Sequence, residues 1–248
     1  MELRALFPRT SLHRPGVDVL TAFTLGLLAV QVTVWLQGGV YTWVDGQKLP
    51  REEILKWAVS REALLEGRVW TVATHVLLHG GWLHFLLNGL IIYMVGGRVY
   101  HILGPRSFAA ICGWGVLGGT LLHVGAHPNM PLVGASAAGM ALLLALTGLS
   151  PESRMWPLPV SGRNLGRGLL LASLLLGLMD PALGIPGFRA LGAFAGKYGM
   201  GSLFEIGHLY HFGGGLAGWF YVKRLMRRPV TLEELRAKRA RREGAAVS

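Results

Sequence analysis

The chain has 248 residues, of which 52% are hydrophobic and only 15% charged, whereas soluble domains carry about 25% charged residues. Lys and Arg number 24 against 13 Asp and Glu, so the formal net charge is +11. The many apolar residues exclude a disordered chain, and a single cysteine, Cys112, excludes a framework of intrachain disulfides. A chain that is both apolar and basic is either a membrane protein with basic loops or a nucleic-acid binder, and the positions of its charges distinguish the two.

Six segments approach the length of about 20 low-charge residues that crosses a bilayer. In chain order they are 17–37, 81–100, 106–126, 132–149, 168–184 and 205–222. The fifth carries Asp180 and Pro181 near its end, where a proline stops or kinks a helix. The sequence therefore predicts an all-α membrane protein, with these parts: a cytoplasmic N-terminal segment at 1–16, a six-helix membrane domain at 17–225 with an outer interfacial loop at 38–80, and a basic cytoplasmic tail at 226–248.

The basic residues predict the orientation of this bundle. If both termini face the cytoplasm, 17 Lys and Arg lie on that side and 7 on the other, and nine of the 17 belong to the tail. The positive-inside rule selects this arrangement. We therefore expect a multi-pass integral protein of a bacterial inner membrane. Its partner is then the lipid bilayer and not nucleic acid. The sequence does not indicate its oligomeric state.

Polar side chains gather near the outer ends of the second, third, fourth and sixth segments, where burial in the membrane is costly and indicates a functional site. Seven of the nine histidines lie at or near such ends: His75, His79, His84, His123, His127, His208 and His211. Ser136 lies in the fourth segment, about 6 Å deep if the helix starts at Leu132, and His211 lies about 9 Å deep in the sixth. The sequence thus places a serine and a histidine at similar depths.

These residue types suit a serine hydrolase. A serine hydroxyl is a weak nucleophile, so Ser136 needs a base such as His211 to accept its proton and return it to the leaving group. His84 and Asn88, four residues apart on one helical face, are candidate donors to the oxyanion, and His79 lies near that face. In the sixth segment, Gly214 and Gly218 form a G-x-x-x-G ridge that lets another helix approach closely.

At these residues the sequence resembles the rhomboid family of intramembrane serine proteases. His79, His84 and Asn88 have the spacing of the family's H-x4-H-x3-N helix. Gly134-Ala135-Ser136 is similar to the start of its G-x-S-G nucleophile motif, and His211 with Gly214 and Gly218 is similar to its H-x-x-G-x-x-x-G helix. The resemblance covers about residues 15–225.

The resemblance implies a dyad of Ser136 and His211 without a third carboxylate. It implies an oxyanion site made of His84, Asn88 and the Ser136 backbone N–H, and a membrane-embedded loop between the first two segments. The implied reaction is cleavage of a transmembrane segment of another protein near the outer face, often after a small residue. No metal or organic cofactor is implied.

Four positions depart from the family pattern. Ala137 replaces the glycine after the serine, which would add a methyl group near the oxyanion site. Met140 replaces an aromatic residue that packs on the catalytic histidine. Thr71 follows Trp70 where arginine is usual, and Tyr100 replaces an acidic residue after Gly96-Gly97.

Other interpretations stay open on the residues alone. A rhomboid-like protein without activity would bind transmembrane segments without cutting them. A metal-dependent protein would use His75, His79 and His84, although no H-E-x-x-H motif accompanies them. A channel or transporter fits six spans, but the sequence has no inverted repeat and no charged residue in the middle of a segment. We also expect His75 and His127 to be interfacial, and His123 and His208 to have structural roles.

Overall fold

The computed structural model describes residues 19–45, 47–155, 159–227, 233 and 236–237. The predicted N-terminal segment and most of the predicted basic tail lie outside these residues. The first half of the described chain contains α1 (Val19–Leu36), β1 (Tyr41–Val44), β2 (Gln47–Pro50), α2 (Glu52–Leu55), α3 (Arg61–Leu65), α4 (Thr71–Thr74), η2 (His75–Leu77), α5 (Trp82–Ile91), the π-helix η3 (Ile92–Gly96) and α6 (Gly97–Ala126). The second half contains α7 (Ser136–Leu149), α8 (Gly162–Leu178), η4 (Pro181–Leu183), α9 (Phe188–Ala195), η5 (Gly196–Met200), η6 (Gly201–Glu205) and α10 (His208–Met226).

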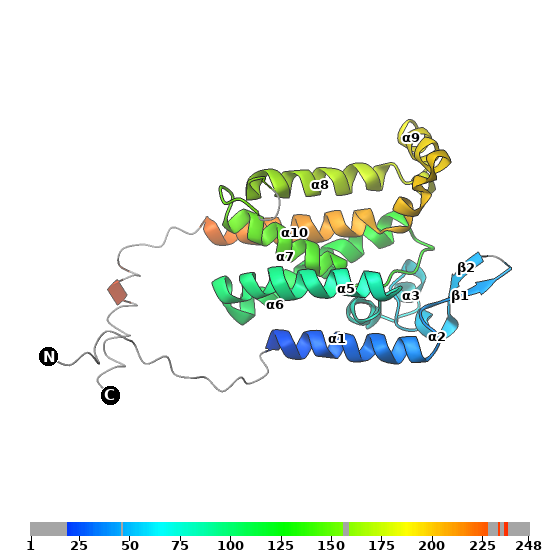
Figure 1. Cartoon of the computed structure of the whole chain (residues 1–248), viewed down its shortest axis with the longest axis horizontal. Helices are drawn as coiled ribbons and strands as arrows, with labels where there is room; N and C mark the ends of the chain where they lie inside the picture. The colour runs from blue at the N-terminus through cyan, green and yellow to red at the C-terminus, as the bar shows by residue number, and fades with distance from the viewer. Residues whose placement is uncertain (1–18, 46, 156–158, 228–232, 234–235, 238–248) are drawn as a thin grey trace.

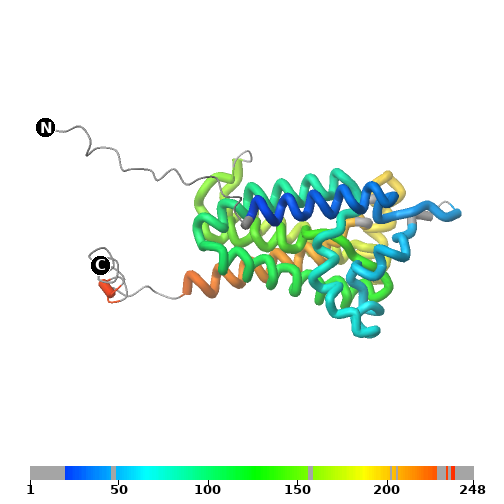
Figure 2. The backbone as a smooth tube through the Cα atoms, turned by 90° about the horizontal axis from the view of Figure 1, so that it is seen from below, coloured from blue at the N-terminus to red at the C-terminus, as the bar shows by residue number. Residues whose placement is uncertain are grey.

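The long helices lie side by side along the long axis of the molecule (Figures 1 and 2). The small elements α2, α3, α9 and the antiparallel hairpin of β1 and β2 gather at one end of this bundle (Figure 1). The helices α5, α7 and α10 all begin at that same end. Their N-terminal turns, which carry unpaired backbone N–H groups, are therefore close to one another.

Helix α7 is the centre of the bundle, packed between α6 and α10 and also touching α8 and α5. Its sequence is almost entirely Ala, Gly and Leu, and buried positions occur all round the helix. A helix that is apolar on every side is stable only when neighbours cover every side. By contrast, α1 and α5 expose large apolar side chains such as Leu25, Leu36, Leu83 and Leu87, as expected of helices that face lipid.

Glycines allow the neighbours of α7 to approach its backbone. A methyl group added at Gly214 or Gly218 of α10 would lie within 3.0 Å of backbone atoms of Ala137 or Ala141. On α6, a methyl group at Gly115 or Gly119 would meet the same two alanines equally closely. The helix that packs on the predicted ridge of Gly214 and Gly218 is therefore α7. Helix α6 supplies a second glycine ridge that was not predicted.

Within the described chain, one helical stretch is long and apolar enough to cross a membrane. It covers residues 82–126 and joins α5, η3 and α6. Gly104 breaks this stretch with a φ of 81° immediately before Pro105, which separates the predicted second and third segments. α1 and α7 are apolar but shorter. The described structure is thus mostly helical, as predicted, and the count of six spans stays a prediction.

Two predicted segment boundaries were wrong. The fourth segment was expected from residue 132, but α7 begins only at Ser136, because Leu132 exchanges two backbone hydrogen bonds with Val59 of the outer loop. Ser136 is therefore the first residue of its helix, and the depth estimated for it was too large. The fifth segment was expected at 168–184, but α8 spans Gly162–Leu178: the Ser161 side chain caps its start, and the chain turns into η4 at Asp180.

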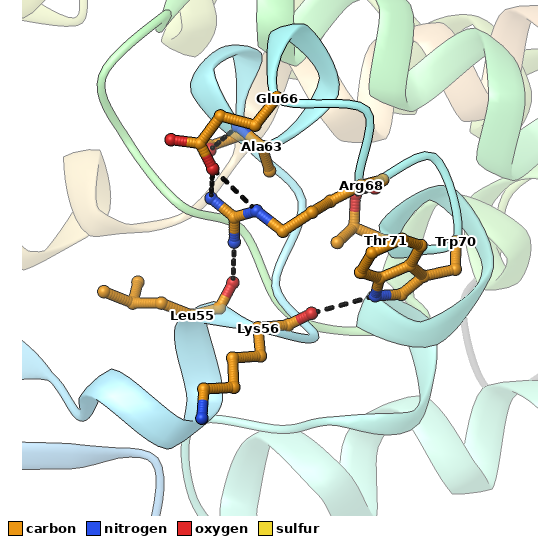
Figure 3. A network of polar contacts seen from close by, with 8 residues as sticks. Leu55, Lys56, Ala63, Glu66, Arg68, Trp70 and Thr71 are labelled. Atoms are coloured by element: carbon orange, nitrogen blue, oxygen red, sulfur yellow. Dashed lines mark hydrogen bonds and ion pairs between the residues drawn. The ribbon is translucent and has the colours of Figure 1, made fainter.

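Within the outer loop, side chains rather than regular structure hold the short helices together (Figure 3). The Arg68 guanidinium donates to the Leu55 carbonyl at 2.9 Å and to the Glu66 carboxylate. The Trp70 indole N–H donates to the Lys56 carbonyl at 3.1 Å. Arg68 therefore fastens α2 to the segment before α4, although the resemblance placed the arginine at position 71.

A buried hydrogen-bonded brace connects the outer loop to the start of α7 and to α10. The Tyr210 hydroxyl donates to the Gly134 carbonyl at 3.1 Å and lies 2.8 Å from His75 Nε2. His75 Nδ1 lies 2.7 Å from the Thr71 carbonyl, and the Gly134 N–H donates to the His75 carbonyl at 2.8 Å. Both polar groups of the Gly134 residue are therefore fixed two positions before Ser136.

The glycine contacts predict a large cost for a side chain at Gly218. In Gly218→Val, the new atoms would overlap the backbone of Ala141, so we expect a loss of about 1–3 kcal/mol in the free energy of unfolding. Thermal unfolding in detergent measures it. Gly168→Val is the matched control, since a methyl group there meets nothing within 4 Å. Equal stability of the two variants would contradict this packing.

The hydrogen bonds of Tyr210 predict a similar loss in the free energy of unfolding when its hydroxyl group is removed. Tyr210→Phe leaves the Gly134 carbonyl and one His75 nitrogen buried without a partner, which costs about 1–3 kcal/mol. Tyr93→Phe serves as the control because Tyr93 is 51% exposed. If both variants unfolded at the wild-type temperature in detergent, the hydrogen bonds of Tyr210 would carry no stability.

Candidate functional site

Ser136 and His211 meet at the end of the bundle where α7 and α10 begin. Nε2 of His211 lies 2.7 Å from Oγ of Ser136, although the two residues are 75 positions apart in the chain. Both side chains are partly buried. Ser136 is the first residue of α7 and His211 lies one turn into α10, so the close packing of these two helices sets the distance. The arrangement allows a proton to pass between the two side chains.

His84 lies on the other side of the segment that leads to Ser136. Gly134 has a φ of +126°, and a methyl group on it would fall 2.8 Å from Cε1 and 2.9 Å from Nε2 of His84. Only glycine leaves room for this ring and adopts this backbone conformation without strain. The Gly80 N–H donates to His84 Nδ1 at 3.4 Å. A neutral His84 ring then carries its proton on Nε2, beside Gly134.

Asn88 and His79 lie close to His84 but are arranged differently from the expectation. The Asn88 amide donates to the His84 carbonyl, one turn earlier on the same helix, at 2.8 Å. One of its two N–H donors is therefore used within α5. His79 is 1% exposed, and its ring packs edge-on against the rings of His84 and Phe85 at 5.2 and 5.6 Å. Desolvation, followed by the nearby His84, lowers the pKa of His79 to about 4, so this side chain is neutral at pH 7.

His75 and His127, which the sequence places at the membrane interface, are both buried within the protein. His75 belongs to the brace with Tyr210, and burial lowers its pKa to about 4. Nε2 of His127 lies 2.9 Å from the Asp180 carboxylate. His123 and His208 contact backbone carbonyls, as their expected structural roles require. Within the described ranges, no three His, Cys, Asp or Glu side chains are grouped as metal ligands would be.

Two of the positions that depart from the rhomboid pattern, Ala137 and Met140, lie on α7 near the site. Ala137 is fully buried, and its methyl group is directed at Gly119 and Gly214 of the neighbouring helices. The sequence predicted this methyl group near the oxyanion site. That prediction was wrong, because the Ala137 side chain points between the packed helices. His208 is the edge-on neighbour of the His211 ring, with centroids 6.2 Å apart. This places an aromatic ring against His211 from one turn earlier on α10, whereas Met140 lies on α7.

Sequence reasoning missed Tyr210 and Arg68, which hold the surroundings of the site. Tyr210 directly precedes His211, and its hydroxyl fixes Gly134 on the other helix. A tyrosine in an apolar segment offers a hydroxyl that needs a partner, but its partner is 76 residues away and leaves no local pattern. Arg68 lies only two positions from Trp70, so a wider search around that tryptophan would have found it.

The site brings together a serine hydroxyl, an imidazole and several hydrogen-bond donors. The backbone N–H groups of the first turn of α7 have no acceptor within the helix, and a helix N-terminus favours an anion. Nε2 of His84 adds a side-chain donor on the Gly134 side. An oxygen that became negative next to Ser136 would therefore face donors already in position.

Comparison with known proteins identifies the family to which the chain is similar. The family model described as the Rhomboid domain matches residues 66–228, which include Ser136, His211, His84 and Asn88. The chain is 27% identical over 142 residues to "Putative rhomboid protease YdcA" of Bacillus subtilis (strain 168), covering 54% of this chain and 64% of that protein. It is 28% identical over 174 residues to "RHOMBOID-like protein 5" of Arabidopsis thaliana, covering 69% of this chain and 49% of that protein.

The aligned part thus spans 64% of the length of the first relative and 49% of the length of the second. The family model covers well over half of this chain, and rhomboid proteins are membrane proteins. With the helical bundle and the motifs on α5, α7 and α10, this match shows that the chain belongs to the rhomboid family.

Proposed function

We propose that this protein is an intramembrane serine endopeptidase that cleaves transmembrane segments of other membrane proteins near the outer face. The observation that carries the proposal is the 2.7 Å contact between Ser136 Oγ and His211 Nε2. Family membership supports it, because rhomboid proteins are generally serine proteases, and so does the name of the Bacillus relative.

In the proposed mechanism, Ser136 Oγ attacks the carbonyl carbon of the scissile peptide bond while its proton passes to His211 Nε2. The carbonyl oxygen becomes an oxyanion that accepts hydrogen bonds from the Ser136 N–H and from His84 Nε2. When the C–N bond breaks, His211 gives the proton to the leaving nitrogen, and an ester remains on Ser136. A water molecule then loses a proton to His211, attacks the ester and releases the second product, and Ser136 regains its proton.

The proposed membrane arrangement has six spans with both termini in the cytoplasm. The distribution of 17 basic residues against 7 supports this orientation. It assigns the ends of α5, α7 and α10 that carry the site to the outer face. The substrates are then proteins that present a transmembrane segment to that face, and no cofactor takes part.

Removal of either member of the dyad should abolish cleavage. Cells with wild-type protein should release membrane-protein fragments that mass spectrometry does not detect with Ser136→Ala or His211→Ala. Each change removes a group that takes part in the reaction and leaves the helix packing intact. Ser173→Ala, which removes another buried serine hydroxyl in a helix, is the control and should keep the fragments. Identical fragment sets from wild type and from Ser136→Ala would reject the mechanism.

Removal of one oxyanion donor should lower turnover without abolishing it. Loss of one donor slows catalysis by about 10²–10³, so His84→Ala should lower kcat by that factor on a reconstituted transmembrane reporter. We expect a smaller effect for Asn88→Ala, because its amide already donates within α5. His101→Ala, an exposed histidine in α6, should retain wild-type turnover. A His84→Ala variant at full speed would remove this residue from the oxyanion site.

A further inference from the structure

Helix α9 and the start of η5 present an apolar face to the outside of the molecule. Leu191 and Phe194 are 55% and 59% exposed, and Tyr198 is 69% exposed. These residues follow one another at spacings of three and four, so they share one side of the helix. The rings of Phe194 and Tyr198 lie together, with centroids 4.8 Å apart. A contiguous apolar patch of this kind marks a surface that binds a partner or a membrane.

The neighbouring side of α9 is fixed against the end of α8. Gly192 and Ala195 are buried, and a methyl group added to Gly192 would overlap the Met179 carbonyl. In the turn between the two helices, the Asp180 carboxylate accepts a hydrogen bond from the Ala182 N–H at 2.9 Å. The direction of the exposed face is therefore set by the packing of α9 on α8.

The contact with α8 also sets the depth of this face, if α8 crosses the bilayer as proposed. Residues 168–179 carry no charge, and Leu171 and Leu175 expose their side chains as residues that face lipid do. Asp180 and Pro181 follow directly. Helix α9 therefore packs where the apolar part of α8 ends, and it projects sideways from the bundle beyond α8 (Figure 1). In a bilayer, the space beside it at that depth belongs to lipid.

The charges of this segment favour a phospholipid surface over a second copy of the chain. Residues 181–204 contain two charged side chains, Arg189 and Lys197, and no acidic residue. A basic helix with Leu and Phe on one face is typical of segments that lie in the membrane interface, where long basic side chains reach the lipid phosphates. A symmetric contact between two copies would instead bring these basic residues together, which is unfavourable.

We propose that α9 is an interfacial membrane helix. The exposed face of Leu191, Phe194 and Tyr198 inserts among the acyl chains of the leaflet at the end of the bundle that carries the candidate site. The two basic side chains lie toward the phosphates of that leaflet. The segment that leads into α10 and to His211 is thereby held at the membrane surface. The proposal rests on the span assigned to α8 and does not depend on proteolysis.

Spin labelling of the full chain in phospholipid vesicles tests the proposal. Cys112→Ala removes the native thiol, and Leu191→Cys, Tyr198→Cys or Ala193→Cys then carries one nitroxide. Power saturation compares collisions with oxygen, which dissolves among acyl chains, and with a nickel chelate, which stays in water. We expect the ratio of oxygen to nickel collisions at Leu191 and Tyr198 to be several-fold higher than at Ala193, an exposed position on another side of α9.

Leu171→Cys is the control for a side chain in lipid, because Leu171 is 57% exposed within the apolar part of α8. Its label should give the same high ratio as the labels on the α9 face. With that control in place, labels at Leu191 and Tyr198 that meet the nickel chelate would put the face in water. Labels shielded from both reagents would mean that protein covers it, and either result would overturn the proposal. A label at Leu171 that met the nickel chelate would contradict the span of α8, and the proposal with it.

Discussion

The contact of backbone with backbone at α7 is the constraint on which the rest of the structure depends. Glycines on α6 and α10 let both helices approach the two alanines of α7 so closely that a methyl group would overlap them. Apolar side chains alone give little drive for helices to associate in lipid, so such close packing is a main source of stability there. It also brings Ser136 and His211 to 2.7 Å. The same packing therefore serves the fold and the reaction that we propose.

A second constraint is the need to pair the polar groups that are buried around the site. At Gly134 the pairing is complete, because the outer loop and Tyr210 bind both of its polar groups. Hydrogen bonds to both groups hold the backbone in one geometry, here immediately before the serine. The ring nitrogens of His79, in contrast, lack protein partners among the described residues. The segment that hydrogen bonds hold in place is therefore the one that leads to Ser136.

Sequence reasoning predicted the residues that depend on local spacing and missed those that depend on distant contacts. The motifs around His84, Ser136 and His211 are short, so their positions on three helices could be read directly. The start of α7 could not, because residues 132–135 are apolar, whereas in the structure Leu132 pairs with Val59 and Gly134 has a positive φ. The role of Tyr210 also depends on a partner on another helix, which no periodicity records.

The central claim is that Ser136 is a nucleophile activated by His211, and a covalent label tests it most directly. A fluorophosphonate, which reacts only with an activated serine, is incubated with the purified protein, and peptide mass spectrometry locates the adduct. The account predicts one adduct, on Ser136, that is absent from Ser136→Ala, strongly reduced in His211→Ala and retained in Ser173→Ala. A folded wild-type protein that forms no adduct would contradict the account and favour a rhomboid-like protein that binds transmembrane segments without cutting them.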